Sequence, residues 1–270
     1  MDLLYIKAII SGIIEGLTEF LPISSTGHLI IVGNLMNETT SNYTQMFDVV
    51  VQLGAILAVV VYFWHKLLPK AMFTDAAVRK TTLDIWFKTI VGVIPAVIIG
   101  AIFNDWMEEH LFNPAVVAGA LIVGGILLFF FDRERGGQKL ETIAELPYRK
   151  AFAIGLIQCL AMIPGTSRSA STIIGGLSLG TSRTLAAEYS FFLAIPTMFG
   201  ASAYKIMKHG FKLSQTEWIA VLIGSVVAFF VAWGVIAFFM SYIRKHNFRL
   251  FAWYRIALGI VVLAYFYLIK

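Results

Sequence analysis

The sequence predicts an all-α, polytopic membrane protein with six transmembrane helices and two re-entrant helical hairpins, arranged as an inverted-topology repeat. Three observations predict this fold class. The chain has 270 residues, of which 59% are hydrophobic and only 14% charged, a composition typical of membrane proteins. Six apolar stretches can cross a bilayer as helices. Two other apolar segments are each broken by a proline and a run of hydroxyl side chains.

The predicted spans are the six continuous apolar stretches. They cover residues 44–64, 89–103, 114–131, 186–204, 218–243 and 250–269. Glu188 and Arg255 lie within spans and are expected to be interior structural partners. The net charge of +5 comes from lysines and arginines in predicted loops, and no basic stripe faces an aromatic platform, so no nucleic-acid partner is expected. A single cysteine, Cys159, excludes an intramolecular disulfide and a cysteine metal site.

The first broken segment, residues 12–33, carries two carboxylates inside an apolar pattern. Glu15 and Glu19 are four residues apart, so they share one face of a helix. Pro22 ends that helix, because its ring clashes with the preceding turn and it has no N–H to donate. Broken backbone survives at membrane depth only where protein or a watery cavity covers it. We therefore expect residues 1–35 to form a re-entrant hairpin.

Hydroxyl side chains follow this proline and can cap a second helix: Ser24, Ser25 and Thr26. The free N–H groups at the start of such a helix favour an anion. His28 lies three residues beyond Ser25, close enough to exchange a proton with a hydroxyl or a leaving group.

Loop charge predicts the orientation of the chain. Three loops are rich in lysine and arginine and are expected in the cytoplasm by the positive-inside rule: 65–88, 132–150 and 241–249. The connection 104–113 carries acids without lysine or arginine, which places it outside. These assignments alternate only if residues 151–182 enter and leave on the same side, so a second re-entrant hairpin is predicted.

The second hairpin repeats the order of the first: apolar helix, proline, hydroxyl cluster, restarted apolar helix. Three pairs of residues align, namely Gly12 with Gly155, Glu15 with Gln158, and Pro22 with Pro164. Loop charge gives the halves opposite orientations, the signature of an inverted-topology repeat. We expect a single membrane domain with one repeat over about residues 1–135 and the other over about 150–270.

The two hairpins together indicate phosphate chemistry. Arg168, in a Gly-Thr-Ser-Arg-Ser turn, suits an oxyanion because a guanidinium binds phosphate bidentately and keeps its charge when desolvated. Two helix N-termini facing one arginine indicate a doubly charged group such as a diphosphate. Carboxylates beside that group repel it unless a divalent cation bridges them or they act as acid and base. The inferred chemistry is phosphoryl transfer to water on an amphiphilic substrate.

Two long motifs, EGLTEFLPISSTGH at residues 15–28 and PGTSRSAST at residues 164–172, resemble the signatures of the bacterial undecaprenyl pyrophosphate phosphatase family, also called the bacitracin-resistance protein family. The likeness covers essentially the whole chain, including FDVVVQLG at residues 47–54. It implies hydrolysis of the C55 lipid carrier diphosphate to its monophosphate at the outer face of the plasma membrane. The product is reused in cell-wall synthesis, and the activity confers bacitracin resistance.

The resemblance also assigns residues. The family's essential positions correspond to Glu15, Glu19, Ser25, His28 and Arg168. Its supporting positions correspond to Ser24, Thr26, Ser167 and Thr172. The residues of the second hairpin add three further substrate-binding candidates, Gln158, Thr166 and Ser169. The family implies Mg²⁺ or Ca²⁺, for which Glu15 and Glu19 are the candidate ligands, and it is associated with a homodimer. Membrane lipids and a polyprenyl diphosphate are the other expected partners.

The residues leave several alternatives open. Ser25 attacks with His28 as its base, or His28 activates a water. A secondary transporter or flippase of an anionic lipid or solute has the same architecture of inverted repeats and broken helices. An acid-phosphatase type of lipid phosphatase needs a further His/Asp pair that the later histidines do not supply. A purely structural protein would not place so many polar groups at membrane depth. The dense Ser-Ser-Thr-Gly-His cluster favours the hydrolase, but does not fix the preferred prenyl length.

Overall fold

The computed structural model describes residues 3–36, 42–133, 139–209 and 213–269. Throughout these ranges the protein is built from helices, and the only β-pairing described there is an isolated bridge between Leu140 and Thr181. Four helical segments are long and apolar enough to cross a membrane: Ala76–Phe103, Pro114–Phe131, Gln215–Ile243 and Arg249–Tyr267. A fifth is added if Met46–Tyr62 and Trp64–Phe73, bent by 71°, form one span. The predicted all-α, multi-pass membrane class is confirmed.

The structure contains eleven α-helices within the described residues. They are α1 (Leu3–Thr18), α2 (Ser25–Leu35), α3 (Asn42–Tyr62), α4 (Trp64–Leu67), α5 (Ala76–Leu111), α6 (Pro114–Phe131), α7 (Tyr148–Gln158), α8 (Arg168–Ser178), α9 (Arg183–His209), α10 (Gln215–Ile243) and α11 (Arg249–Ala264). Short helical turns cover Lys70–Phe73, Cys159–Met162 and Tyr265–Ile269.

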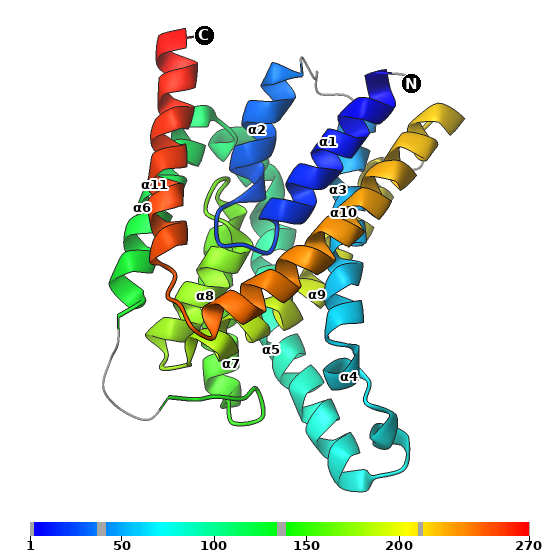
Figure 1. Cartoon of the computed structure of the whole chain (residues 1–270), viewed down its shortest axis with the longest axis vertical. Helices are drawn as coiled ribbons and strands as arrows, with labels where there is room; N and C mark the ends of the chain where they lie inside the picture. Colours follow the sequence, from blue (N-terminus) through cyan, green and yellow to red (C-terminus); the bar gives the residue numbers. More distant parts are fainter. Residues whose placement is uncertain (1–2, 37–41, 134–138, 210–212, 270) are drawn as a thin grey trace.

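Two pairs of these helices form hairpins that point toward each other. In Figure 1, α1 begins and α2 ends at the end of the molecule where the C-terminus lies, whereas α7 begins and α8 ends nearer the opposite end. The backbone of Leu140 bonds to both Gly180 and Ser182, so the chain enters and leaves the second hairpin at one place. The closed ends of the hairpins therefore meet inside the protein.

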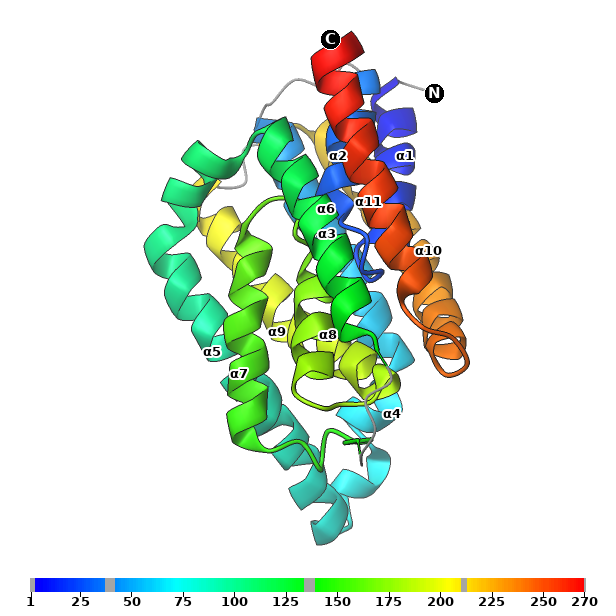
Figure 2. The ribbon, with the colours of Figure 1, turned by 90° about the vertical axis from the view of Figure 1, so that its left-hand side faces the viewer.

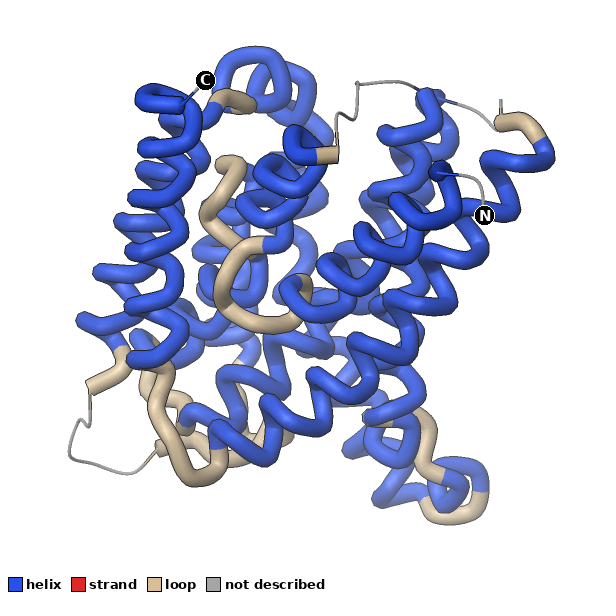
Figure 3. Tube along the Cα trace, turned by 45° about the horizontal axis from the view of Figure 1, so that its top comes forward, coloured by secondary structure: helices blue, strands red, loops and turns tan. Residues whose placement is uncertain are grey.

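The second hairpin lies between α6 and α5. Figure 2 shows α8 in the space between α6 and α7. Figure 3 shows loop segments, in tan, that interrupt the helices in the middle of the molecule as well as at its ends. Broken backbone is thus enclosed by helices, as its hydrogen-bonding needs require.

Helix α5 is much longer than the predicted span 89–103. It begins at Ala76, where the side chain of Asp75 accepts from the N–H of Ala77 at 2.7 Å, and it continues through Pro95 to Leu111. The prediction of a loop over residues 76–88 is therefore wrong. The cause lies in tertiary contacts, because the buried Lys88 donates to the carbonyl of Ala144 at 2.6 Å and pairs with an acid on its own helix.

Helix α9 forms the centre of the bundle and contacts α3, α5, α8 and α10. Its side chains Tyr189, Phe191 and Phe192 are fully buried. Phe191 packs edge-on against Phe20 at the break of the first hairpin, with ring centroids 5.6 Å apart. The core of the protein therefore lies directly beneath the place where the hairpins meet.

Close helix contacts hold each hairpin to a long neighbouring helix. A Cβ at Gly12 of α1 would lie 2.5 Å from the carbonyl oxygen of Gly224 in α10. A Cβ at Gly155 of α7 would overlap the backbone of Gly92 in α5. Glycine at both positions lets the backbones approach, as is common between membrane helices.

Candidate active site

Both hairpins break in the same way, at a serine with left-handed backbone. Ser24 has φ of 72° and Ser167 has φ of 71°, and they are the only non-glycine residues with positive φ in the described part of the chain. Each is an N-cap: Ser24 Oγ accepts from the N–H of Gly27, and Ser167 Oγ accepts from the N–H of Ala170. Such backbone strain persists only where the surroundings impose it, and it clusters at functional sites. The breaks therefore present the N-termini of α2 and α8.

Three of the predicted essential residues meet between these breaks. Ser25 Oγ donates to Glu19 Oε2 at 2.8 Å, and Arg168 Nη2 lies 3.4 Å from Glu19 Oε1. The other guanidinium arm of Arg168 donates to the carbonyl of Ser190 in α9 at 3.0 Å. Only about a tenth of the Glu19 and Arg168 side chains is exposed, 10% and 11% respectively. One carboxylate thus joins the first hairpin to the second.

Glu15 lies one helical turn before Glu19 and is more deeply buried. It is 2% exposed, and neither of its carboxylate oxygens has a hydrogen-bond partner among the described residues. An ionised carboxylate in that position is costly unless a cation or a shared proton compensates it. Mg²⁺ is commonly held by one or two carboxylates together with substrate phosphates. Glu15 therefore offers two buried oxygens to such an ion, whereas both oxygens of Glu19 already contact Ser25 and Arg168.

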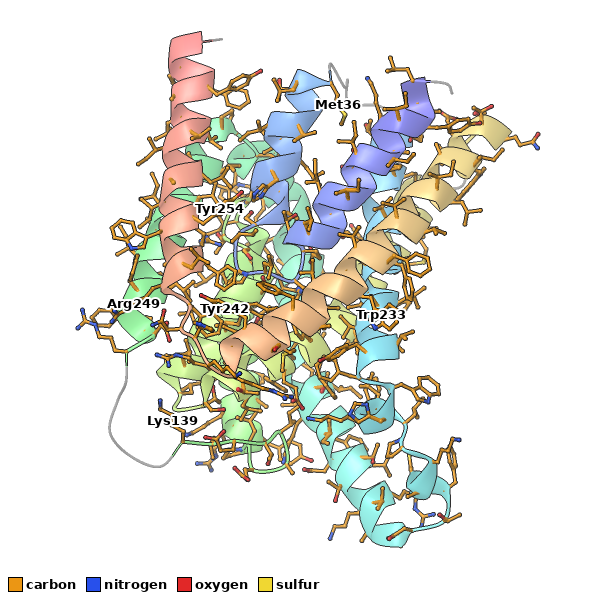
Figure 4. All side chains as sticks on the ribbon, in the orientation of Figure 1. Met36, Lys139, Trp233, Tyr242, Arg249 and Tyr254 are labelled. Atoms are coloured by element: carbon orange, nitrogen blue, oxygen red, sulfur yellow. The ribbon has the colours of Figure 1, made fainter. Side chains whose placement is uncertain are left out.

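His28 is held by two partners. Its Nδ1 lies 2.7 Å from the carbonyl oxygen of Ser24, which accepts only, so Nδ1 carries a proton. Its Nε2 faces the hydroxyl of Tyr254 in α11 at 2.7 Å, and the two rings stack with centroids 5.5 Å apart. Figure 4 shows Tyr254 pointing from α11 toward α2. The structure therefore brings His28 to Tyr254, while the Ser25 hydroxyl pairs with Glu19.

Hydroxyls of the second hairpin tie the two breaks together. Ser169 donates to the carbonyl of Leu21 in the first break at 2.8 Å and lies 3.0 Å from Ser167 Oγ. Thr172 bonds to Ser190 Oγ at 2.7 Å, beneath Arg168. Ser169 therefore positions the backbone of the first break, and Thr172 positions the turn that carries Arg168.

The remaining candidates lie around this centre. Thr26 is partly buried in the first turn of α2, and Thr166 directly precedes the second N-cap. Gln158, the counterpart of Glu15 in the aligned motifs, is 2% exposed, and its Nε2 lies 3.5 Å from Thr197 Oγ1. Its Oε1 has no hydrogen-bond partner among the described residues.

Arg255 is a fully buried guanidinium that contacts both breaks. Its Nη1 donates to the carbonyl of Pro22, and its Nη2 reaches the carbonyls of Gly165, Thr166 and Ala120 at 3.2, 2.9 and 3.1 Å. The sequence predicted an interior structural partner, and this is confirmed.

Sequence reasoning missed Tyr254 and Ser190 as parts of the site. A hydroxyl residue next to an intramembrane arginine was the only available signal for Tyr254. For Ser190, inside an apolar span, the sequence holds no comparable signal.

The fold and this site define a multi-pass, all-helical membrane protein with a buried polar centre where two broken hairpins meet. The family assignment is equally direct. The chain belongs to the family described as bacitracin resistance protein BacA, whose sequence profile matches residues 8–261. It is 52% identical over 264 residues to undecaprenyl-diphosphatase 1 of Clostridioides difficile (strain 630), covering 97% of this chain and 96% of that protein. It is 48% identical over 269 residues to an undecaprenyl-diphosphatase of Lactiplantibacillus plantarum (97% and 98% covered) and 47% identical over 263 residues to one of Enterococcus faecalis (96% and 95% covered).

Proposed function

We propose that this protein hydrolyses undecaprenyl diphosphate to undecaprenyl phosphate and inorganic phosphate in the bacterial cell membrane. The reaction returns the lipid carrier to cell-wall synthesis and confers bacitracin resistance. The observation that carries the proposal is the contact of Arg168 with Glu19, and of Glu19 with Ser25, between two helix N-termini. This arrangement offers an anion-binding group, a proton acceptor and a hydroxyl within one buried centre.

The phosphate groups are held by Arg168 and by the free N–H groups at the starts of α2 and α8. A helix N-terminus binds phosphate through its backbone donors and its dipole, and the guanidinium adds charge-assisted hydrogen bonds. Thr26, Thr166 and the two capping serines border these N-termini. The site therefore suits a diphosphate.

Ser25 is the nucleophile that this geometry favours. Its Oγ attacks the terminal phosphorus, the bond from that phosphorus to the leaving undecaprenyl phosphate breaks, and Glu19 takes the hydroxyl proton. A water then hydrolyses the phosphoserine and regenerates the serine. His28, with Nε2 at Tyr254, is the second acid–base group at the first break. Wild-type turnover by Ser25→Ala would instead indicate direct attack by water.

Glu15 and Glu19 would hold a divalent cation, Mg²⁺ or Ca²⁺, beside the phosphates. Such an ion supplies neutralisation of the phosphate charge. The two buried oxygens of Glu15 without donors support this assignment.

We further propose that both hairpins are re-entrant and that α3, α5, α6, α9, α10 and α11 are the six spans. The halves, about residues 1–135 and 150–270, then form an inverted repeat. The matched backbone angles of Ser24 and Ser167 support this, as do the close contacts of Gly12 and Gly155 with long helices. We also propose that the centre opens to the outer face of the membrane, as the resemblance to the family implies. Tags near residues 140 and 185 should lie on one side of the membrane, and tags on opposite sides would refute the second re-entrant hairpin.

Activity is tested with purified protein in detergent and undecaprenyl diphosphate, by measuring released phosphate. Arg168→Ala and Glu19→Ala should abolish release while the protein still folds. Arg249→Ala, an exposed arginine that Figure 4 shows pointing away from the bundle, is the control and should keep full activity. Near-normal turnover by either site variant would refute the assignment. Binding without phosphate release by the wild type would favour a carrier.

A further inference from the structure

An apolar groove of about 420 Å³ lies between α6 and the second hairpin. One wall is a single face of α6, where the lining positions from Val116 to Leu127 recur every three or four residues. The other wall is formed by Ile157, Leu160, Ile163 and Ile174 of the second hairpin. A volume in this range suits a drug-sized or lipid-sized ligand.

The groove faces the surrounding lipid. Val123 on one wall is 54% exposed and Leu160 on the other is 48% exposed. Figure 2 shows α8 between α6 and α7, and Ser171 and Ile174 of α8 line the groove. A hydrocarbon chain can therefore enter it sideways from the bilayer while its remainder stays in the lipid.

The polar end of the groove is the N-terminus of α8. Its two hydroxyl-bearing lining residues are Thr166, directly before the N-cap Ser167, and Ser171, whose Oγ donates to the Ser167 carbonyl at 2.9 Å. Arg168 belongs to the same turn and reaches Glu19. The groove is thus continuous with the place where the phosphates are proposed to bind.

We propose that this groove holds the first part of the isoprenoid tail of the diphosphate substrate. The inference rests on the proposed function and adds to it a surface of the protein that recognises the isoprenoid tail. When the diphosphate of the substrate lies at the start of α8, the groove is the apolar surface next to its isoprenoid tail. Packing of the tail against these walls favours a lipid diphosphate over a short one, through dispersion contacts and, for a substrate that reaches the groove from water, through burial of apolar area.

Gly119 offers a way to fill the groove without disturbing the fold. It lines the groove, and a Cβ there would meet no heavy atom of the described residues within 4 Å. Gly119→Leu also removes a glycine from a helix interior, so the variant should not lose stability. Gly234 in α10 is equally open and lies outside the groove, which makes Gly234→Leu the matched control.

The experiment compares farnesyl diphosphate with dimethylallyl diphosphate in detergent. For the farnesyl substrate, Gly119→Leu should raise KM about tenfold, as expected for the lost burial of roughly two methylene groups. Its kcat for that substrate, and KM for the short substrate, should stay within twofold of wild type. Gly234→Leu should match wild type throughout. Val123→Phe, on the same wall, provides a second variant should Gly119→Leu fail to fold.

The outcomes separate the two proposals. Wild-type protein that hydrolyses neither diphosphate, nor undecaprenyl diphosphate, refutes the proposed function itself. An active wild type in which Gly119→Leu and Val123→Phe behave like the control overturns the groove as a tail site. An equal rise in KM for the farnesyl and the dimethylallyl substrate also overturns the groove as a tail site, because the effect then lies at the phosphates that both substrates share. A changed oligomeric state with unchanged KM would make the groove a surface between copies of the chain.

Discussion

Arg255→Lys tests whether one buried guanidinium keeps the two hairpin breaks in register. Arg255 is 0% exposed, and its two terminal nitrogens bond to carbonyls of Pro22, Gly165, Thr166 and Ala120. These carbonyls come from three separate parts of the chain: the first break, the second break and α6. Lysine keeps the charge but has a single nitrogen, so it cannot occupy both the position of Nη1, at Pro22, and that of Nη2, at the second break and α6.

The magnitude follows from the bonds that lysine cannot replace. At least one of the four bonds is lost, since one nitrogen can replace Nη1 or Nη2 but not both, and a hydrogen bond to a charged group contributes about 1.5–3 kcal/mol. We therefore expect the free energy of unfolding to fall by about 2 kcal/mol. We expect kcat to fall about a hundredfold, since a displacement of about 1 Å between the breaks misaligns the reacting groups.

The assay combines thermal unfolding in detergent with phosphate release from undecaprenyl diphosphate. Arg249→Lys, at the exposed start of the same helix, is the control and should change neither quantity. Wild-type stability and turnover in Arg255→Lys would refute the reasoning. A rise in KM with unchanged kcat and stability would also refute it, because it would make the arginine a substrate ligand instead of a positioning residue.

Three other changes follow from the contacts of the site and the helices. Glu19→Gln removes the proton acceptor, so phosphate release should fall at least about a hundredfold, and it leaves the buried Arg168 without its carboxylate, so the unfolding temperature should also fall; turnover within tenfold of wild type would contradict the first expectation. Tyr254→Phe keeps the ring stack but removes the hydroxyl facing His28, so kcat should fall roughly fivefold, the equivalent of one neutral hydrogen bond. A loss above a hundredfold would show that the phenol itself reacts. Gly12→Leu should lower the free energy of unfolding by about 1–3 kcal/mol through overpacking against α10, whereas Gly234→Leu, in open space, should not. Equal unfolding temperatures of the two would contradict that close contact.

The fold class and both helix breaks could be predicted from the sequence because they depend on local chemistry. Proline disfavours the helix interior, and at both breaks it is followed within three residues by the serine that caps the next helix, after Pro22 for α2 and after Pro164 for α8. Proline alone does not predict a break, because Pro95 lies inside α5 and Pro196 inside α9. The limits of α5 could not be predicted. Hydropathy counts the charge of Lys88 against a span, while in the folded protein that charge is satisfied by carbonyls more than fifty residues away.

In the site, too, the features set by local sequence could be predicted, whereas contacts between residues far apart in the sequence could not. The pairing of the two hairpins predicted that Arg168 and Glu19 share one site, but their direct contact, 3.4 Å in the structure, was not predicted. The contact of His28 with Tyr254 joins residues 226 positions apart, and no spacing rule encodes it. Ser25 lies near two possible bases in the sequence. Its choice of Glu19 depends on the left-handed turn at Ser24, which only the three-dimensional structure reveals.

The charges around the breaks predict that anion binding and hairpin docking are coupled. Arg168 is neutralised in part by Glu19, but every described hydrogen bond of Arg255 goes to a backbone carbonyl. A buried guanidinium paired only with dipoles retains most of its charge, and its field is weakly screened in an apolar surrounding. Because Arg255 contacts the carbonyls of both breaks, its positive charge lies close to the proposed phosphate site. A diphosphate would therefore be attracted by the same arginine that holds the hairpins together, and bound anion would in turn favour the docked arrangement over one in which the breaks separate.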